Sequence, residues 1–124
     1  MKDHLIINEL KQKVGRAFTY EIDNETGYCT KLDLTSKDYY FQGLIRHHSV
    51  KEKEEILELI SKLAHLKYLD LRRNKLRKMP HSFGNLHKLE YLDLGSNDLG
   101  KVPDWIEYNK DLTYLNVGVN LLTE

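Results

Sequence analysis

A block of eleven residues recurs three times in the second half of the chain, and no other sequence feature constrains the fold as strongly. It reads LKYLDLRRNKL from Leu66, LEYLDLGSNDL from Leu89 and LTYLNVGVNLL from Leu112, so the copies start at equal intervals along the chain. Self-similarity at a fixed period of this length is typical of solenoids, in which each repeat buries its apolar face against its neighbours. The sequence therefore predicts a stack of coils over residues 66–124.

The order of residue types inside each copy predicts its local structure. Two apolar residues with one residue between them make a short strand whose apolar side chains point inward. Each copy then has an asparagine, as Asn74, Asn97 and Asn120, whose side chain can hydrogen-bond backbone groups that the turn leaves unpaired. The residues expected to fill the core from the side opposite the strands, the convex side of the stack, are Met79, Phe83, Leu86, Val102 and Ile106. Asn109 stands where a leucine is expected, so the second convex segment should pack less well.

The interval from Leu66 to Leu89, which is repeated from Leu89 to Leu112, resembles the leucine-rich repeat family of the LxxLxLxxNxLxxLPxxIxxLxx type. The three asparagines share one register, and Pro80 and Pro103 share another. The resemblance implies a curved solenoid in which the residues between and just after the strand leucines point to the concave face. It also implies an adaptor role, because relatives with this type of repeat serve as adaptors for signalling proteins such as small GTPases, kinases or phosphatases.

The sequence before Leu66 predicts an expanded first repeat. Residues 29–34 match the first six positions of a repeat, but the next repeat begins only at Leu66, later than the period requires. In this insertion, Ser49 and Glu52 form a capping box and apolar residues follow at helical spacing. A helix of about four turns, over roughly residues 50–63, should therefore cover the convex side, preceded by a loop over residues 37–48.

Further upstream, the sequence predicts a cap for the solenoid. Residues 18–34 read as a β-hairpin, and residues 3–14 read as a helix that ends at Gly15. The predicted fold class is α/β: a short leucine-rich-repeat solenoid of about four parallel concave strands, with this helix-plus-hairpin cap and one convex helix. The predicted division is a cap (1–28), an expanded first repeat (29–65) and the repeats (66–124), which are two full copies and a third that stops soon after its asparagine.

Two columns of side chains are expected to cross the concave face, with neighbouring strands about 4.8 Å apart. The first column is Lys31, Tyr68, Tyr91 and Tyr114, the second is Asp33, Asp70, Asp93 and Asn116, and Arg72, Arg73 and Ser96 lie beyond them. Tyrosines flanked by acids and an arginine pair are typical of protein-binding surfaces, because tyrosine offers contact area and a hydroxyl at a small entropic cost. All of these residues are candidate protein-binding residues, although tyrosines that only shield the sheet would produce the same column.

Three other patterns suggest chemistry, and each has a simpler explanation. The aspartate column matches the roughly 5 Å carboxylate separation of retaining glycosidases, or a cation trap, but an open curved sheet offers no cleft. Residues 95–101 fit the GxxxxGK phosphate loop, but Val102 replaces the Ser or Thr that would bind magnesium. The six histidines lack metal-ligand spacing, and Cys29 stands at a core position. We therefore expect no catalytic residue, no cofactor and no metal.

Charge and cysteine content bound the partners and the compartment. Nineteen Lys and Arg residues balance nineteen Asp and Glu residues, which argues against a dedicated binder of nucleic acid or anionic membrane. The single cysteine cannot form an intrachain disulfide, and the N-terminus shows neither a signal peptide nor a transmembrane helix, which together predict a cytoplasmic protein. Residues 67–78 are a local exception, with six basic residues against one aspartate. They either meet an acidic partner or keep the turn soluble.

The predicted function is therefore a non-catalytic module that binds another protein through its concave sheet. Two alternatives stay open: the recognition segment of a longer signalling enzyme, such as a GTPase, kinase or ubiquitin ligase, or a unit that self-associates through its C-terminal edge. Both follow from the last repeat, which stops at Glu124 and has no cap after it. We expect a piece of a longer protein or a naturally short copy.

Overall fold

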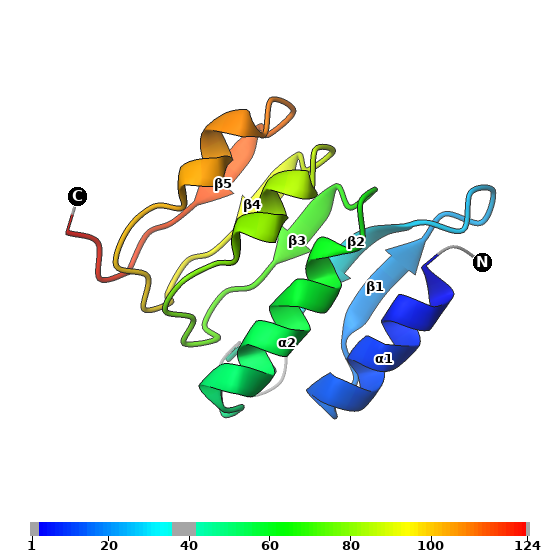
Figure 1. Cartoon of the computed structure of the whole chain (residues 1–124), viewed down its shortest axis with the longest axis horizontal. Helices are drawn as coiled ribbons and strands as arrows, with labels where there is room; N and C mark the ends of the chain where they lie inside the picture. The colour runs from blue at the N-terminus through cyan, green and yellow to red at the C-terminus, as the bar shows by residue number, and fades with distance from the viewer. Residues whose placement is uncertain (1–2, 36–41, 124) are drawn as a thin grey trace.

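A five-stranded sheet runs along the molecule, and helical segments cover one of its faces (Figure 1). The computed structural model describes residues 3–35 and 42–123. Its elements are α1 (His4–Val14), β1 (Thr19–Ile22), β2 (Cys29–Asp33), α2 (Val50–Ser61), β3 (Tyr68–Asp70), the 3-10 helix η1 (His81–Asn85), β4 (Tyr91–Asp93), the 3-10 helix η2 (Asp104–Tyr108) and β5 (Tyr114–Asn116). The predicted fold class, a short α/β solenoid with four parallel strands, a helix-plus-hairpin cap and one convex helix, is confirmed.

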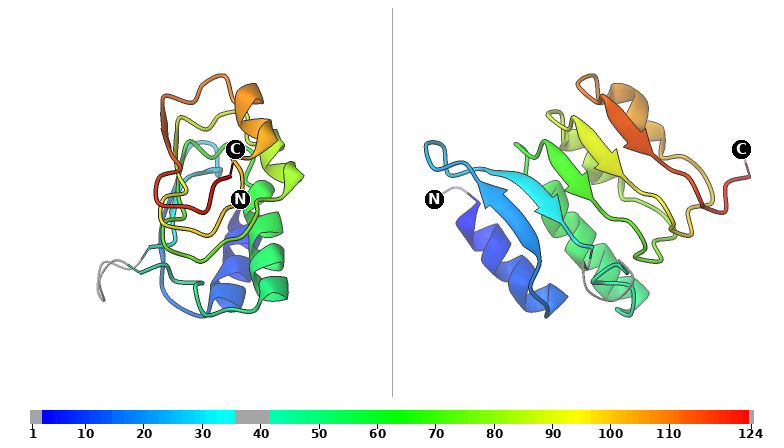
Figure 2. Two further views of the ribbon diagram at one scale, coloured as in Figure 1. Left: turned by 90° about the vertical axis from the view of Figure 1, so that its left-hand side faces the viewer. Right: turned by 180° about the vertical axis from the view of Figure 1, so that it is seen from behind.

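Strand order in the sheet follows chain order, so each coil lies beside the one before it. β1 is antiparallel to β2, and β2 to β5 are parallel. Leu69, Leu92 and Leu115 face one another in register. Leu69 and Leu92 are fully buried, whereas Leu115 is 38% exposed because β5 is the last strand of the sheet. The core lies between the strands and the helical layer. Figure 2 shows these two layers on opposite sides of the molecule.

The asparagine of each repeat binds the backbone of its own coil and of a neighbouring coil. Asn97 Oδ1 accepts hydrogen bonds from Asn74 N–H at 3.0 Å and Leu76 N–H at 3.1 Å. Its Nδ2 donates to the carbonyl oxygens of Leu71 and Leu94, at 3.1 and 3.0 Å. We call the three side chains Asn74, Asn97 and Asn120 the asparagine ladder, and the predicted pairing with turn backbone is confirmed.

Gly43 brings the expanded first repeat into this ladder. Asn74 Oδ1 accepts a hydrogen bond from Ile45 N–H at 2.9 Å, as Asn97 Oδ1 does from Leu76 N–H. A Cβ atom on Gly43 would overlap the Asn74 side-chain amide, so only glycine allows this approach. The loop expected over residues 37–48 is described from residue 42 onward, where it forms turns up to α2; its earlier part lies outside the described residues.

Helices α1 and α2 each have a terminal signal that the sequence predicted. α1 ends at Gly15, which has a left-handed φ of 75°, as predicted. The capping box of α2 is present, with Ser49 and Glu52 each accepting from the other's backbone N–H. Asp3 Oδ2 accepts from Cys29 N–H at 2.7 Å, which joins the start of α1 to β2. Among the described residues, no helix has the length and apolar character needed to cross a membrane.

The convex segments agree with the prediction in the first repeat and differ from it in the second. Phe83 and Leu86 are fully buried, but Val102 is 38% exposed, so its predicted core position is wrong. η2 starts after Pro103, and Trp105 takes the buried place instead, with its ring 5.7 Å from that of Phe83. Asn109 is buried, and both its Oδ1 and Trp105 Nε1 lack a hydrogen-bond partner, consistent with poorer packing of this segment.

Replacing Leu92 with alanine should lower the free energy of unfolding by about 2–5 kcal/mol, because a fully buried side chain of the shared core is removed. Urea denaturation measures this loss. Leu121→Ala is the matched control: Leu121 is 64% exposed, and its truncation should change stability by less than about 0.5 kcal/mol. Equal losses for the two variants would contradict a core continuous through β4.

Replacing Asn97 with leucine should cost about 2–5 kcal/mol, because buried N–H and carbonyl groups of two coils lose their partner. Asn120→Leu is the comparison: Asn120 is only partly buried, so water can replace its hydrogen bonds and the loss should be about 1 kcal/mol. Thermal and urea unfolding of both variants measure the difference. A similar loss at the two positions would show that burial of the asparagine side chain does not determine its contribution to the free energy of unfolding.

Candidate functional site

The first column of the concave face is a continuous stack. Lys31, Tyr68, Tyr91 and Tyr114 pair in register across β2 to β5. The Tyr68 and Tyr91 rings lie 4.2 Å apart at 7°, and the Tyr91 and Tyr114 rings lie 4.3 Å apart at 5°. We call Tyr68, Tyr91 and Tyr114 the tyrosine ladder. The in-register strands place the rings at stacking distance, so the repeat period itself produces the stack.

One cation and one carboxylate extend the tyrosine ladder toward the cap. Lys31 Nζ lies 4.8 Å from the centre of the Tyr68 ring, a cation–π distance. The same atom lies 3.7 Å from Glu21 Oε2 on β1. Glu21 was not predicted as part of this face. The hairpin was predicted from its alternation, but the pairing of Glu21 with Lys31 depends on the register of the two strands, which the alternation alone did not specify.

The side chains of the second column are more buried than those of the first. Asp33, Asp70 and Asp93 are all buried, and Asn116 is half-buried. Each side chain accepts a hydrogen bond from the backbone N–H two residues later. The acceptor–donor pairs are Asp33 with Thr35 at 2.8 Å, Asp70 with Arg72 at 3.1 Å, Asp93 with Gly95 at 2.9 Å, and Asn116 with Gly118 at 2.9 Å. This column therefore shapes the ends of the strands, and its carboxylates offer little area to a partner.

Arg72 covers two of these carboxylates. Its Nε and second terminal nitrogen donate to Asp70, at 3.0 and 2.8 Å, and its Nε lies 3.4 Å from Asp93 Oδ2. The hydrogen bonds to Asp70 raise the pKa of Arg72, so the guanidinium remains charged. Burial raises the pKa of Asp93 above its ordinary value, with the Asp70 charge adding to the effect. Arg72 is thus both the neutralising group of the aspartates and an accessible cation of the face.

Arg73 and Ser96 lie at the turn that leaves the strands. Both have a left-handed backbone, with φ of 60° and 54°, and Val119 in the next repeat has φ of 54°. Arg73 is exposed and Ser96 is half-buried. They continue the surface beyond Arg72, at the margin of the tyrosine ladder.

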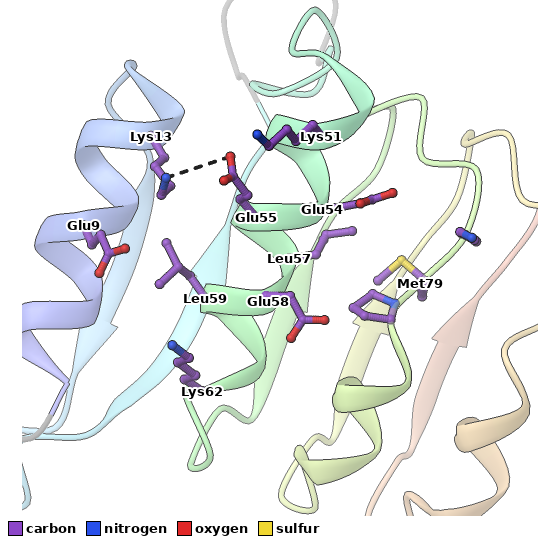
Figure 3. A pocket seen from close by; sticks show the side chains of 12 residues that line it. Glu9, Lys13, Lys51, Glu54, Glu55, Leu57, Glu58, Leu59, Lys62 and Met79 are labelled. Atoms are coloured by element: carbon purple, nitrogen blue, oxygen red, sulfur yellow. Dashed lines mark ion pairs between the residues drawn. The ribbon is translucent and has the colours of Figure 1, made fainter.

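A groove on the opposite face is chemically different. It has a volume of about 660 Å³ and lies over α2, between α1 and residues 78–80 (Figure 3). Leu57, Leu59 and Met79 contribute its apolar part, and acidic and basic side chains alternate around it. Lys13 Nζ and Glu55 Oε1, for example, lie 4.0 Å apart. This mixture of charges presents no single sign to a ligand.

Reactive groups elsewhere do not assemble into a reaction centre in the part of the chain that is described. Burial raises the pKa of the Cys29 thiol to about 11, so the thiol stays protonated and unreactive at neutral pH. Within residues 3–35 and 42–123, no group of three His, Cys, Asp or Glu side chains is placed to hold a metal ion.

Comparisons with known proteins agree with the repeat architecture. Residues 58–99 match the family model of the leucine rich repeat. A solved structure of the leucine-rich-repeat ectodomain of the receptor kinase SOBIR1 from Arabidopsis thaliana superposes with a TM-score of 0.61 and 22% identity, covering 98% of this chain and 68% of that one. No curated protein matches the sequence. The predicted resemblance to the family is confirmed.

The predicted cytoplasmic location is wrong on this comparison, because the similar structure is a receptor ectodomain. The prediction relied on the single cysteine and on the residue pattern at the N-terminus. A solenoid held together by burial and by the asparagine ladder needs no disulfide, so a low cysteine count does not report its compartment.

Replacing Asp93 with asparagine should raise the free energy of unfolding at pH 7. Asparagine removes a buried charge and keeps the acceptor for Gly95 N–H, as Asn116 does for Gly118 N–H. Because the folded-state pKa of Asp93 is raised, the wild-type protein gains stability relative to the variant as pH falls through that pKa. The difference should vanish below the ordinary value of 3.8.

Urea titrations of both proteins at several pH values measure this difference. Arg72→Lys is the comparison: it keeps the buried Asp93 carboxylate and a cation beside it, so its stability should still rise as pH falls through the pKa of Asp93. A variant less stable than wild type at pH 7 would show that the contact with Arg72 outweighs the burial of the charge.

Proposed function

We propose that this chain, a leucine-rich-repeat protein, is a non-catalytic module that binds another protein through the concave face of its sheet. The observation that carries this proposal is the tyrosine ladder, a row of stacked aromatic rings ending in the cation of Lys31. The proposed binding residues that a partner can reach are Lys31, Tyr68, Arg72, Arg73, Tyr91, Ser96 and Tyr114. Asp33, Asp70, Asp93 and Asn116 belong to the proposed site by shaping the strand ends, and Asp70 and Asp93 hold Arg72. We also propose the division into a cap (1–28), an expanded repeat (29–65) and repeats (66–124).

The accessible groups of this face favour protein binding. Tyr114 is 43% exposed, Tyr68 and Tyr91 are half-buried, and Arg72 presents a charged group beside them. Tyrosine and arginine are the residue types most enriched among those that dominate binding energy. Because the rings already hold one another in place, a partner would order few side chains on binding, which lowers the entropic cost.

Stacking and binding are compatible roles for the tyrosine ladder. Stacking covers both faces of the Tyr91 ring with its neighbours, and Tyr91 as a whole remains half-buried. Rigid aromatic edges with hydroxyl groups suit hydrogen bonding to a partner's backbone and side chains. Burial raises the pKa of Tyr91, with the neighbouring Tyr68 adding to the effect, and the hydroxyl is protonated at neutral pH with or without this shift.

A second candidate is that the chain is the recognition segment of a longer signalling enzyme. The similar solved structure is itself the ectodomain of a receptor kinase, which favours this candidate over a free-standing adaptor. The concave face would then supply recognition, and another part of the protein would supply catalysis.

Replacing Tyr91 and Tyr114 with alanine should abolish specific capture of protein partners in pull-downs with the purified full chain. Tyr108→Ala is the matched control: it removes an exposed tyrosine from η2, on the opposite side of the molecule, and should leave capture unchanged. Circular dichroism verifies that both variants fold. If the concave variant captures the wild-type set while the convex variant loses it, the binding face is the convex one.

A further inference from the structure

A second groove lies at the start of α2, away from the concave face. It has a volume of about 450 Å³ and opens between α2 and the turn that follows β3. We call it the basic groove, after the residues that line it: Lys53, Lys75, Arg77, Lys78, Leu57 and Leu76. Three of its cations, Lys75, Arg77 and Lys78, belong to the basic stretch at residues 67–78, and Lys53 comes from α2 in the expanded repeat.

The base of the basic groove is apolar. Leu57 and Leu76 are each 2% exposed and form the wall of the core at this point. Val50, the first residue of α2, is 59% exposed at the margin. An apolar base with charged groups around it favours a ligand that carries both an apolar group and charges.

The four cations of the basic groove outnumber its two carboxylates, Glu54 and Asp98, and form no ion pair with the described residues. Across residues 3–35 and 42–123, none of the four cationic side chains has a carboxylate within 4.0 Å. Lys53 Nζ donates to the carbonyl oxygen of Lys75 at 3.3 Å, which holds two cationic residues beside each other. Burial and the charge of Lys75 lower the pKa of Lys53, and the charge of Asp98 offsets part of this effect. Lys53 and Lys75 therefore repel each other. An anionic ligand would relieve this repulsion.

We propose that the basic groove binds an acidic peptide segment of a partner protein, with carboxylates near the four cations and an apolar side chain over Leu57 and Leu76. This site is separate from the concave face and does not depend on the function proposed for it. The chemistry required of the ligand is carboxylates that flank one apolar residue.

A nucleic acid fits the basic groove less well than a peptide. Glu54 and Asp98 also line it, and their charges repel a continuous row of phosphates. A peptide can place neutral residues opposite these two carboxylates. The lining also contains no aromatic residue on which a base could stack.

The basic groove continues toward the second convex segment, which gives an extended peptide room. A neighbouring groove of about 360 Å³ shares Arg77 and Lys78 with it and adds Lys101, the carboxylate of Asp104 and Trp105, which is buried and presents little ring area for a base to stack on. Basic side chains therefore follow one edge of the stack from α2 to the turn before η2. A peptide lying along this edge would cross two coils and meet a cation in each.

The test uses the full chain and a short fluorescent peptide in which glutamates flank a leucine, with binding followed by fluorescence anisotropy. We expect binding that weakens as salt increases and is absent for the same peptide with glutamines. Arg77→Glu together with Lys78→Glu should weaken binding at least about tenfold. Lys67→Glu together with Lys110→Glu makes the same change of charge at exposed positions outside the groove, and should leave the affinity within about twofold.

Three results would overturn the proposal. The first would be equally tight binding of the glutamine and glutamate peptides, and the second would be equal affinity of the two double variants for the glutamate peptide. The third would be tighter binding of single-stranded DNA of matched length than of the peptide. The last result would assign the basic groove to nucleic acid. Circular dichroism of both double variants verifies that altered binding is not caused by unfolding.

Discussion

Each coil of this solenoid has turn backbone groups that cannot pair within a sheet, and the asparagine ladder satisfies them. A side-chain amide combines one acceptor with two donor hydrogens on a short stem, and Asn97 uses both functions across adjacent coils. Buried backbone groups without partners are costly, so this pairing decides whether coils can stack at all. Gly43 shows how strict the requirement is: the expanded first repeat meets Asn74 with a residue that has no Cβ.

The candidate binding face is a consequence of that stacking. Equal coils place equivalent residues side by side, so a tyrosine in each repeat becomes the tyrosine ladder and an aspartate in each becomes a row of strand-end acceptors. The close carboxylates of Asp70 and Asp93 then require a cation, which Arg72 supplies. Scaffold and surface are thus made by the same repeat period, and a partner would meet rings and a cation whose positions are already determined.

Much of this structure follows from the sequence because it depends on local or repeated signals. The strands, the asparagine ladder, the capping box at Ser49 and the end of α1 at Gly15 are of this kind. Features that depend on tertiary position were not predictable. The chain path around Pro103 leaves Val102 exposed and buries Trp105, and the register of the hairpin places Glu21 beside Lys31. Burial of Asp70 under Arg72, and the approach of Lys53 to Lys75, depend equally on packing between elements.

The central claim, that side-chain amides replace backbone partners between coils, is tested most directly by hydrogen exchange measured by NMR. Leu76 N–H donates to the side chain of Asn97, whereas Leu94 N–H donates to the backbone carbonyl of Asn116. Protection reports how often each hydrogen bond opens. We expect the Leu76 amide to exchange as slowly as the Leu94 amide. Exchange of the Leu76 amide at the rate of an unstructured peptide, while Leu94 stays protected, would contradict the central claim.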